Sequence, residues 1–316
     1  MSSETTLELP VIDFTNLNNL ANWEAVKSKV HEALVEYGCF EAIFDKVPSD
    51  IRKEIFGALE KLFNLPLQTK QLNVSKKPYF GYAGQFPNMP LFESMGIDDA
   101  NIYEKVESLT KIFWPNGNPS FSKTINSFSE HVSELDQIVR KMVLESLGVE
   151  KYLDEHLNTT NYFLKTMKYK GPETSDTKVG LDTHTDTAIL TILFQSQVDG
   201  LEVLTKDGRK WISYKPSSES QSFIVMMNDC FHAWSNGRLH SPFHRVMMTG
   251  NEARYSATLF SVPKGGCIIK APEELVDEEH PLLYKPFDRE EFLKHSFNKE
   301  KGKRDDQFAL RSYCGV

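Results

Sequence analysis

The hydrophobic pattern of this chain changes its period near residue 160, and the change limits the folds it can adopt. Before that point, apolar residues recur every three to four positions, as in amphipathic helices. After it, short β-rich runs alternate with turn signals such as Val198-Asp-Gly200 and Asn236-Gly237. The expected strands are 162–169, 188–194, 201–204, 211–214, 222–227, 243–249 and 254–262. So many short strands predict a jelly roll, also called a double-stranded β-helix, or a barrel.

Three helices are expected in the first half, at 23–37, 51–63 and 121–147. Gly38 and Gly148 follow the first and the third, where a glycine commonly ends a helix. Segment 65–120 is rich in Pro, Gly, Asn and aromatic residues and is expected to be irregular. We expect it to cover a pocket; a plain surface cover over the core is the alternative.

These patterns predict one structural unit with a mainly β core. Residues 1–158 form an N-terminal helical region that includes the pocket-covering segment 65–120. Residues 159–270 form the double-stranded β-helix catalytic core, and residues 271–316 form a peripheral C-terminal layer. A length of 316 residues suits such a unit, since β-barrel enzymes often reach this size without dividing.

The composition favours a protein that acts on small molecules in the cytoplasm. The net charge is −8 and no long basic run occurs, which argues against nucleic acid and anionic membranes as partners. The N-terminal residues lack the features of a signal peptide, and the apolar runs are too short to span a bilayer. The four cysteines are far apart and are expected to be free thiols. No obligate protein partner is evident.

Two histidines and an aspartate in the second half form a candidate metal site: His184-x-Asp186 and His244. Two histidines and one carboxylate are the ligands of the facial triad, which holds non-haem Fe(II) and leaves positions open. Residues i and i+2 of a strand point to one face, so His184 and Asp186 can reach one ion. His232 and His240 are rivals of His244, and zinc also accepts such a ligand set.

Arg254-x-Ser256 suits a carboxylate that would bind beside the metal. The two residues share one face of a predicted strand, and an arginine inside a barrel is costly unless it meets an anion. A guanidinium binds a carboxylate through two parallel hydrogen bonds, and the serine adds a donor. Tyr169 on an earlier strand adds a phenolic donor. An outward-facing arginine is the alternative.

The chain resembles the plant Fe(II)/2-oxoglutarate-dependent dioxygenases along nearly its whole length. The matching motifs follow the order and spacing of that family: Leu9-Pro-Val-Ile-Asp13, Glu36-Tyr-Gly-Cys-Phe40, His184-Thr-Asp186, Gly200-Leu-Glu-Val203, Ser235-Asn-Gly237, His244-Arg-Val246 and Arg254-Tyr-Ser256. Within the family, Met167-Lys-Tyr-Lys-Gly-Pro172 and Tyr313-Cys-Gly-Val316 are similar to the AOP-type branch, which modifies glucosinolate side chains and lies near the auxin-oxidising dioxygenases.

The resemblance implies a jelly-roll fold flanked by helices and a specific cofactor set. Fe(II) would be held by His184, Asp186 and His244, and the 2-oxoglutarate co-substrate by Arg254 and Ser256, with Tyr169 nearby. O2 is consumed, and ascorbate serves as a reductant. Many relatives have an asparagine two residues before this tyrosine, whereas Met167 stands here, which weakens the assignment of Tyr169.

The implied reaction is oxidation of a small specialised metabolite or hormone, by default hydroxylation, with release of succinate and CO2. Expected substrate contacts are aromatic residues that core packing explains equally well: Phe80, Phe92, Phe113 and Phe308. Three alternatives are considered: an Fe(II) oxidase in which Arg254 and Ser256 bind the substrate carboxylate, a non-catalytic binding jelly roll, and a zinc hydrolase. Zinc would leave Arg254 and Ser256 without a use.

Overall fold

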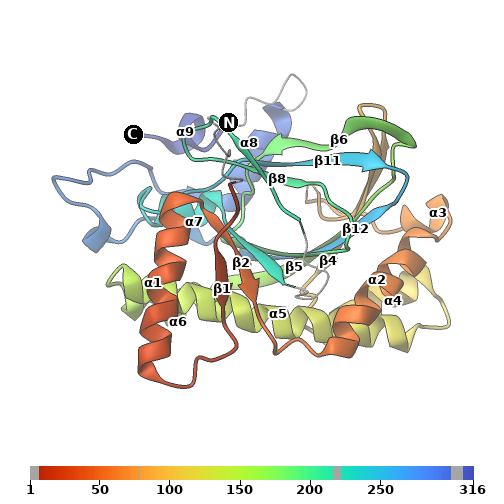
Figure 1. Ribbon diagram of the computed structural model, residues 1–316, viewed down its shortest axis with the longest axis horizontal. Coiled ribbons are helices and arrows are strands. Elements are labelled where there is room, and N and C mark those ends of the chain that lie inside the picture. Colours follow the sequence, from red (N-terminus) through yellow and green to blue (C-terminus); the bar gives the residue numbers. More distant parts are fainter. Residues whose placement is uncertain (1–6, 78, 216–221, 300–308) are drawn as a thin grey trace, which may run out of the picture.

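Two β-sheets lie face to face at the centre of the molecule (Figure 1). The structure is a computed structural model that describes residues 7–77, 79–215, 222–299 and 309–316. The larger sheet contains, in spatial order, β1 (Val11–Asp13), β2 (Cys39–Ile43), β10 (Phe223–Met227), β7 (Leu190–Gln195), β12 (Arg254–Pro263), β5 (Thr160–Tyr169), β4 (Met89–Asp98) and β3 (Tyr82–Phe86). The smaller sheet contains β6 (Thr174–His184), β11 (His244–Gly250), β8 (Leu201–Leu204) and β9 (Trp211–Ser213). This arrangement confirms the predicted jelly roll.

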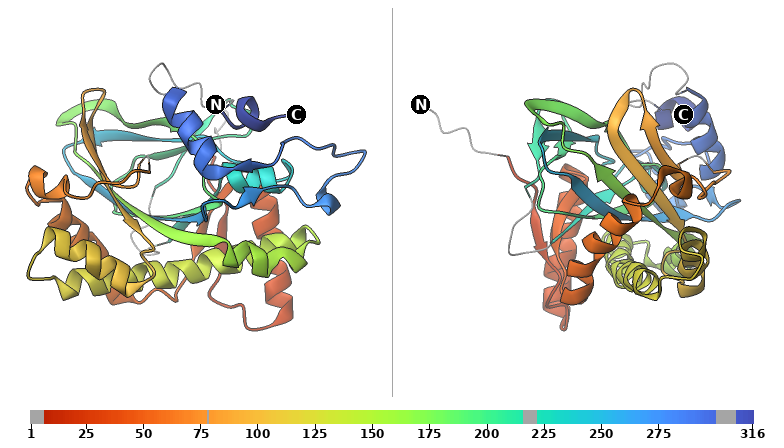
Figure 2. Two further views of the ribbon diagram at one scale, coloured as in Figure 1. Left: turned by 180° about the vertical axis from the view of Figure 1, so that it is seen from behind. Right: turned by 90° about the vertical axis from the view of Figure 1, so that its right-hand side faces the viewer.

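Helices from the first half of the chain cover the outer face of the larger sheet, and the two C-terminal helices lie on the opposite side of the molecule (Figures 1 and 2). The helices are α1 (Leu20–Glu36), α2 (Ser49–Phe63), α3 (Leu67–Lys70), α4 (Tyr103–Phe113), α5 (Pro119–Ser146), α6 (Leu153–Asn158), α7 (Asp229–Trp234), α8 (Arg289–Lys299) and α9 (Ala309–Cys314). A short strand pair, β13 (Ile268–Ile269) with β14 (Phe287–Asp288), lies in the C-terminal part.

The long helix α5 forms the floor beneath the larger sheet. The side chain of Asn118 caps its first turn by accepting a hydrogen bond from the Phe121 amide at 3.2 Å. Gly148 follows its last turn with a positive φ of 69°, a conformation that glycine adopts without strain. In between, an apolar stripe faces the sheet, and the Phe128 ring lies 5.8 Å from that of Phe194. Burial of this stripe fixes the sheet against the helix layer.

The inner faces of the two sheets pack against each other at both ends of the jelly roll. At one end Phe92, Met167 and Tyr169 of the larger sheet contact Val246 and Met248 of β11. At the other end a second apolar cluster joins β2, β7 and β10 to β8 and β9. The interior between these ends is where the predicted site residues lie.

The prediction of an irregular segment over residues 65–120 was wrong. The segment contains α3 and α4, and β3 and β4 form a hairpin that extends the larger sheet beside β5. Glu93 illustrates why the sequence misled: its buried carboxylate pairs with Lys70 at 2.9 Å and accepts from the Tyr82 hydroxyl at 2.8 Å. Polar residues that find such partners can occupy a buried strand without showing an apolar pattern.

The predicted helices and most predicted strands of the β region are confirmed within a few residues at each end. The strand β6 was not predicted, because its sequence contains no β-rich run. In the described ranges, we find no helix with the length and apolar character that crossing a bilayer requires.

Candidate metal centre

His184 and His244 lie directly opposite each other on neighbouring strands. His184 is the last residue of β6 and His244 the first of β11, and the two are register partners in the antiparallel pair. Their ring centroids are 4.2 Å apart. Strand pairing therefore brings together two ligands that are 60 positions apart in the chain.

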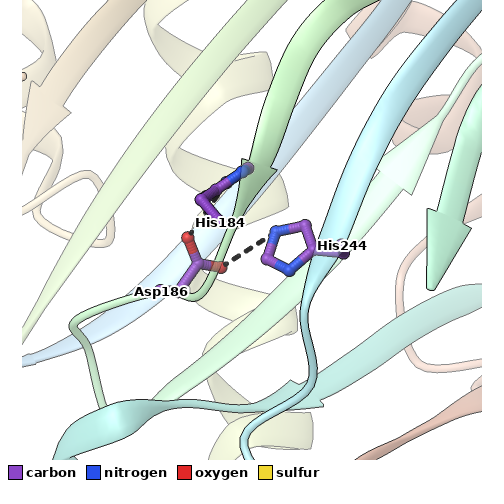
Figure 3. A group of neighbouring side chains, drawn as sticks. All are labelled: His184, Asp186 and His244. Atoms are coloured by element: carbon purple, nitrogen blue, oxygen red, sulfur yellow. Dashed lines mark ion pairs between the residues drawn. The ribbon is translucent and has the colours of Figure 1, made fainter. Parts of the chain in front are cut away.

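Asp186 completes the cluster from a loop (Figure 3). Its Oδ1 lies 3.7 Å from His184 Nε2, and its Oδ2 lies 3.7 Å from His244 Nε2. Within the described residues, these three side chains are the only group of histidines, cysteines and carboxylates whose ligand atoms could share one ion. The strand argument for Asp186 was wrong, since β6 ends at His184 and the aspartate lies two residues beyond it.

Hydrogen bonds orient both imidazoles with Nε2 toward the carboxylate. The Nδ1 of His184 contacts the backbone oxygen of Asp182 at 2.7 Å, and that of His244 contacts the oxygen of Pro242 at 3.3 Å. A protonated Nδ1 that donates to a carbonyl leaves the Nε2 lone pair available for a metal. The arrangement matches the donor set of a facial triad.

The Asp186 carboxylate is held in its charged form. Burial raises its pKa, but His244, His184 and the Thr191 hydroxyl together lower the pKa below its usual value. The Thr191 hydroxyl donates to Asp186 Oδ2 at 2.7 Å, and the Asn228 amide nitrogen, in the orientation that satisfies its neighbours, donates to the same hydroxyl at 3.2 Å. Sequence reasoning missed Thr191, and only its position five residues after the aspartate could have suggested it.

Asp229 connects the loops that carry the ligands, and it too was missed. Its carboxylate accepts from the hydroxyl of Thr185 at 3.0 Å and from that of Ser241 at 2.8 Å. Its backbone amide donates to the backbone oxygen of Asp186 at 2.9 Å. One residue at the start of α7 thus fixes the Asp186 loop to the segment that precedes His244.

Neither rival histidine belongs to the described group whose ligand atoms lie together. The Nε2 of His232 contacts the Tyr284 hydroxyl at 2.8 Å, and its Nδ1 faces the backbone oxygen of Leu239 at 2.5 Å. Burial lowers the pKa of His240 to about 4, so this ring is neutral in a mostly buried position. The His232 ring thereby connects the turn after α7 to Tyr284.

Arg254 and Ser256 lie on β12 and face the interior, as predicted, and both are fully buried. Arg254 Nη2 donates to Gln195 Oε1 at 2.5 Å. In the described structure, Arg254 Nε, Arg254 Nη1 and the Ser256 hydroxyl have no hydrogen-bond partner. Three buried donors without acceptors fit a bound carboxylate, because orphaned buried donors are otherwise costly.

Tyr169 pairs in register with Arg254, and the guanidinium carbon lies 5.2 Å from the centre of its ring. Burial raises the pKa of Tyr169 to about 12, so the phenol is neutral. Its hydroxyl donates to the sulfur of Met167 at 3.3 Å. The Tyr169 hydroxyl therefore already donates to Met167, whereas its predicted role was to donate to the co-substrate.

Gly200 leaves room for the Arg254 side chain. The motif Gly200-Leu-Glu-Val203 includes this glycine, but the sequence alone did not show why a glycine is needed there. A Cβ at Gly200 would lie 3.0 Å from the backbone oxygen of Met247 and 3.2 Å from Arg254 Cδ. Both distances are too short for an ordinary contact, so any larger residue would push the arginine away.

The four candidate substrate aromatics have different surroundings. Phe92 packs against Tyr169, with ring centroids 5.5 Å apart, and Phe80 stacks on Phe163 at 4.0 Å. Phe80 and Phe92 belong to two separate interior clusters, whereas Phe113 belongs to the main core and packs edge-on against Trp114, so the three are not brought together. Phe308 lies outside the residues that the structure describes.

Comparison with known proteins agrees with this geometry. Residues 155–263 match the 2OG-Fe(II) oxygenase superfamily, and residues 9–89 match the N-terminal family described as a non-haem dioxygenase in morphine synthesis. A probable 2-oxoglutarate-dependent dioxygenase of Arabidopsis thaliana, AOP1.2, is 52% identical over 98% of this chain and 96% of its own. The chain belongs to the 2OG-Fe(II) oxygenase superfamily. As a dioxygenase of this superfamily it uses Fe(II), 2-oxoglutarate and O2.

Two solved structures of dioxygenases share the architecture. The rice dioxygenase for auxin oxidation is 28% identical with a TM-score of 0.81, over 98% of this chain and all of that one. The Arabidopsis dioxygenase for auxin oxidation, in complex with 2-oxoglutarate, is 25% identical with a TM-score of 0.77, over 86% of this chain and 99% of that one. The predicted family is confirmed, and so is the likeness to the AOP-type and auxin-oxidising branches.

Proposed function

We propose that this dioxygenase oxidises a C–H bond of a small specialised metabolite or hormone, with hydroxylation as the expected outcome. In the balanced reaction, the substrate, O2 and 2-oxoglutarate give the alcohol, succinate and CO2. One oxygen atom enters the substrate and the other enters the new carboxylate of succinate. Desaturation and demethylation consume the same co-substrates and would be identified by the product.

We assign the residues as follows. His184, Asp186 and His244 hold Fe(II), which supplies the oxygen chemistry when bound. Arg254 and Ser256 hold the distal carboxylate of 2-oxoglutarate, and Tyr169 packs beside them. The chain itself contributes position and exclusion of water, which lower the barrier by bringing the reactants together in the correct orientation.

The observation that carries the proposal is the buried guanidinium of Arg254 with two nitrogens that lack a protein acceptor. A site built for 2-oxoglutarate requires such an anion anchor next to the metal. Arg254 lowers the pKa of Tyr169 and Asp186 raises it, which supports the placement of the arginine and the metal-binding aspartate near the same tyrosine. An oxidase that used Arg254 for its substrate would release no succinate, so succinate release separates the two functions.

We also propose that residues 1–158, 159–270 and 271–316 form one structural unit that works in the cytoplasm on a small molecule. The larger sheet supports the first point, because β1 to β4 come from the first 158 residues. The net charge of −8 supports a small-molecule substrate over nucleic acid. We expect no obligate protein partner.

Replacement of Asp186 tests the function directly. Asp186→Ala should abolish succinate release with Fe(II), 2-oxoglutarate and ascorbate supplied, while thermal unfolding shows that the protein remains folded. Asp182→Ala is the matched control, because it removes an exposed carboxylate from the same region of the chain. Wild-type turnover in Asp186→Ala, or equal loss in both variants, would refute the ligand assignment.

A further inference from the structure

Arg289 is a buried charge in the C-terminal layer. It is the first residue of α8, and it is 7% exposed. Among the described residues it forms no ion pair, and its guanidinium donates to Thr187 instead: Nε to the backbone oxygen at 2.9 Å and Nη2 to the side-chain hydroxyl at 3.4 Å. A buried guanidinium is costly unless its contacts compensate for the lost hydration. The position of Arg289 is therefore best explained by what it does at Thr187.

Thr187 follows Asp186 in the loop that connects β6 to β7. The backbone oxygens of its two neighbours accept from the amides of the first two residues of α7, at 2.9 Å for Asp186 and 3.1 Å for Ala188. The Thr187 oxygen accepts from two side chains, Arg289 Nε at 2.9 Å and Cys230 Sγ at 3.2 Å. A thiol is a weak donor and a guanidinium a strong one, so Arg289 makes the stronger contact to this carbonyl.

Two contacts of Asp288 fix the start of α8 and give Arg289 a rigid base. Asp288 Oδ1 caps the helix by accepting from the Glu291 amide at 3.0 Å, and its Oδ2 accepts from the Gly266 amide at 3.1 Å. Beside the loop, the guanidinium carbon of Arg289 lies 5.7 Å from the centre of the Phe80 ring. The side chain thus extends from a fixed backbone to the loop.

This contact bears on the metal centre through the peptide groups around Thr187. The peptide group before Thr187 is held by α7, and the one after it is held by Arg289. Asp186, which precedes Thr187, places one carboxylate oxygen 3.7 Å from each of the two facing histidine Nε2 atoms. Metal–ligand distances tolerate errors of only about 0.2 Å, so rotation of this backbone would weaken metal binding.

We propose that Arg289 is a positioning residue of the metal centre: it holds the Thr187 carbonyl from the C-terminal layer and thereby fixes the backbone that carries Asp186. The layer formed by residues 271–316 then takes part in metal binding, although it contributes none of the three assigned ligands. The inference rests on the proposed function, because it takes those three side chains as ligands of Fe(II).

The charge of Arg289 alone would have the opposite effect on metal binding. Burial lowers the pKa of Arg289, and the charge of Asp186 is one of the effects that raise it, so the two groups interact. A cation near the ligands repels a divalent metal ion. Removal of a residue that acted only through its charge would therefore tighten Fe(II) binding, whereas removal of a positioning residue weakens it.

Anaerobic calorimetry of the full chain with Fe(II) alone measures this sign. Arg289→Met removes the donors with little change of volume and should raise the Kd for Fe(II) by about tenfold. Arg289→Lys keeps a cation that can donate to the Thr187 oxygen, and its Kd should lie within about threefold of the wild-type value. Lys294→Met is the matched control, because it removes a charge from an exposed position of α8, where Lys294 pairs with Glu291 at 2.7 Å. Its Kd should equal that of the wild type.

Hydrogen exchange of the metal-free protein shows whether the loop itself is held. In Arg289→Met, amides of residues 185–189 should exchange about threefold to tenfold faster than in the wild type, as expected for the loss of one hydrogen bond. Amides of α5 should exchange at the wild-type rate. The Kd for 2-oxoglutarate at saturating Fe(II) should not change, because the proposed carboxylate anchor lies on β12.

The outcomes separate this inference from the function on which it rests. Failure of the wild type to bind Fe(II) would contradict the metal site itself. Normal wild-type binding with an unchanged or tighter Kd in Arg289→Met would overturn only the positioning role. Equally faster exchange in the loop and in α5 would overturn it too, since Arg289 would then serve the fold as a whole. An Arg289→Lys variant as weak as Arg289→Met would assign the effect to packing and would have the same consequence.

Discussion

Replacement of Arg254 by methionine should have opposite effects on the ligand-free protein and on co-substrate binding. Arg254 is fully buried, and only its Nη2 donates to a described protein acceptor, Gln195. Burial lowers the pKa of this guanidinium, which reflects the cost of keeping its charge away from water. Removal of a buried and incompletely paired charge is often neutral or stabilising. We therefore expect Arg254→Met to be at least as stable as the wild type without 2-oxoglutarate.

The cost of the same change appears when 2-oxoglutarate binds. Loss of charge-assisted hydrogen bonds from Arg254 Nε and Nη1 should weaken binding by about 1.5 to 4 kcal/mol, or roughly tenfold to a thousandfold. At a concentration of about 100 times the wild-type Kd, 2-oxoglutarate stabilises the wild type by about 2.7 kcal/mol. For a hundredfold weaker variant, the same concentration equals its Kd and gives only about 0.4 kcal/mol.

Thermal unfolding converts these energies into a measurable shift. An unfolding entropy of about 2.1 cal/mol/K per residue, over the 316 residues of the chain, gives about 0.7 kcal/mol/K. The co-substrate should then raise the Tm of the wild type by about 4 °C and that of Arg254→Met by less than about 1 °C. Anaerobic scanning fluorimetry with Fe(II), with and without 2-oxoglutarate, measures both values.

Arg245→Met provides the matched control for this experiment. Arg245 lies on β11, pairs with Glu202 at 2.7 Å and stacks 3.9 Å from the Trp211 ring centre. Its loss should leave the shift caused by 2-oxoglutarate intact. A wild-type shift in Arg254→Met would refute the anchor, and destabilisation of the ligand-free variant by several kcal/mol would show that Arg254 serves the fold.

Three further changes test the rest of the site. Thr191→Val removes the hydrogen bond to Asp186 Oδ2 and should lower Fe(II) affinity by about tenfold to a hundredfold, measured by anaerobic iron titration; an unchanged affinity would contradict a positioning role. Tyr169→Phe should change the affinity for 2-oxoglutarate by less than about tenfold, because the Tyr169 hydroxyl donates to Met167. Burial raises the pKa of Tyr169 to about 12, so the pH dependence of the wild-type affinity should contain no tyrosine ionisation between pH 7 and about 10. The Asp186 pKa lies below its usual value, so its stabilising effect is present above the unfolded pKa of about 3.9 and is lost as the pH falls through the folded value. Metal-free Asp186→Asn should therefore lose less stability than the wild type in urea titrations below about pH 5, and parallel curves would contradict this sign.

The parts of the site that the sequence predicted are those that local strand geometry determines. Arg254 and Ser256 share a face because β12 is a regular strand, and ten consecutive register pairs with β5 keep the alternation intact. An arginine within such an apolar strand signals an internal anion before any coordinates are known. His184 and His244 were found as residue types at a spacing, and only the pairing of β6 with β11 shows that they are opposite each other.

The parts that the sequence did not reveal depend on partners far along the chain. The strand β6 reads as polar, because most of its residues are exposed and its apolar positions are few. Asp229 is an ordinary aspartate until the fold brings Thr185 and Ser241 to its two oxygens.

Met167 shows how a single residue of β5 limits the hydrogen bonds that are available to the co-substrate. It lies between Lys165 and Tyr169 on the same face, and its sulfur accepts the hydrogen bond of the Tyr169 hydroxyl. An asparagine here, as the family resemblance led us to expect, would present an amide donor to the co-substrate, whereas methionine presents none. Binding of 2-oxoglutarate must then depend on Arg254 and Ser256 beyond the metal.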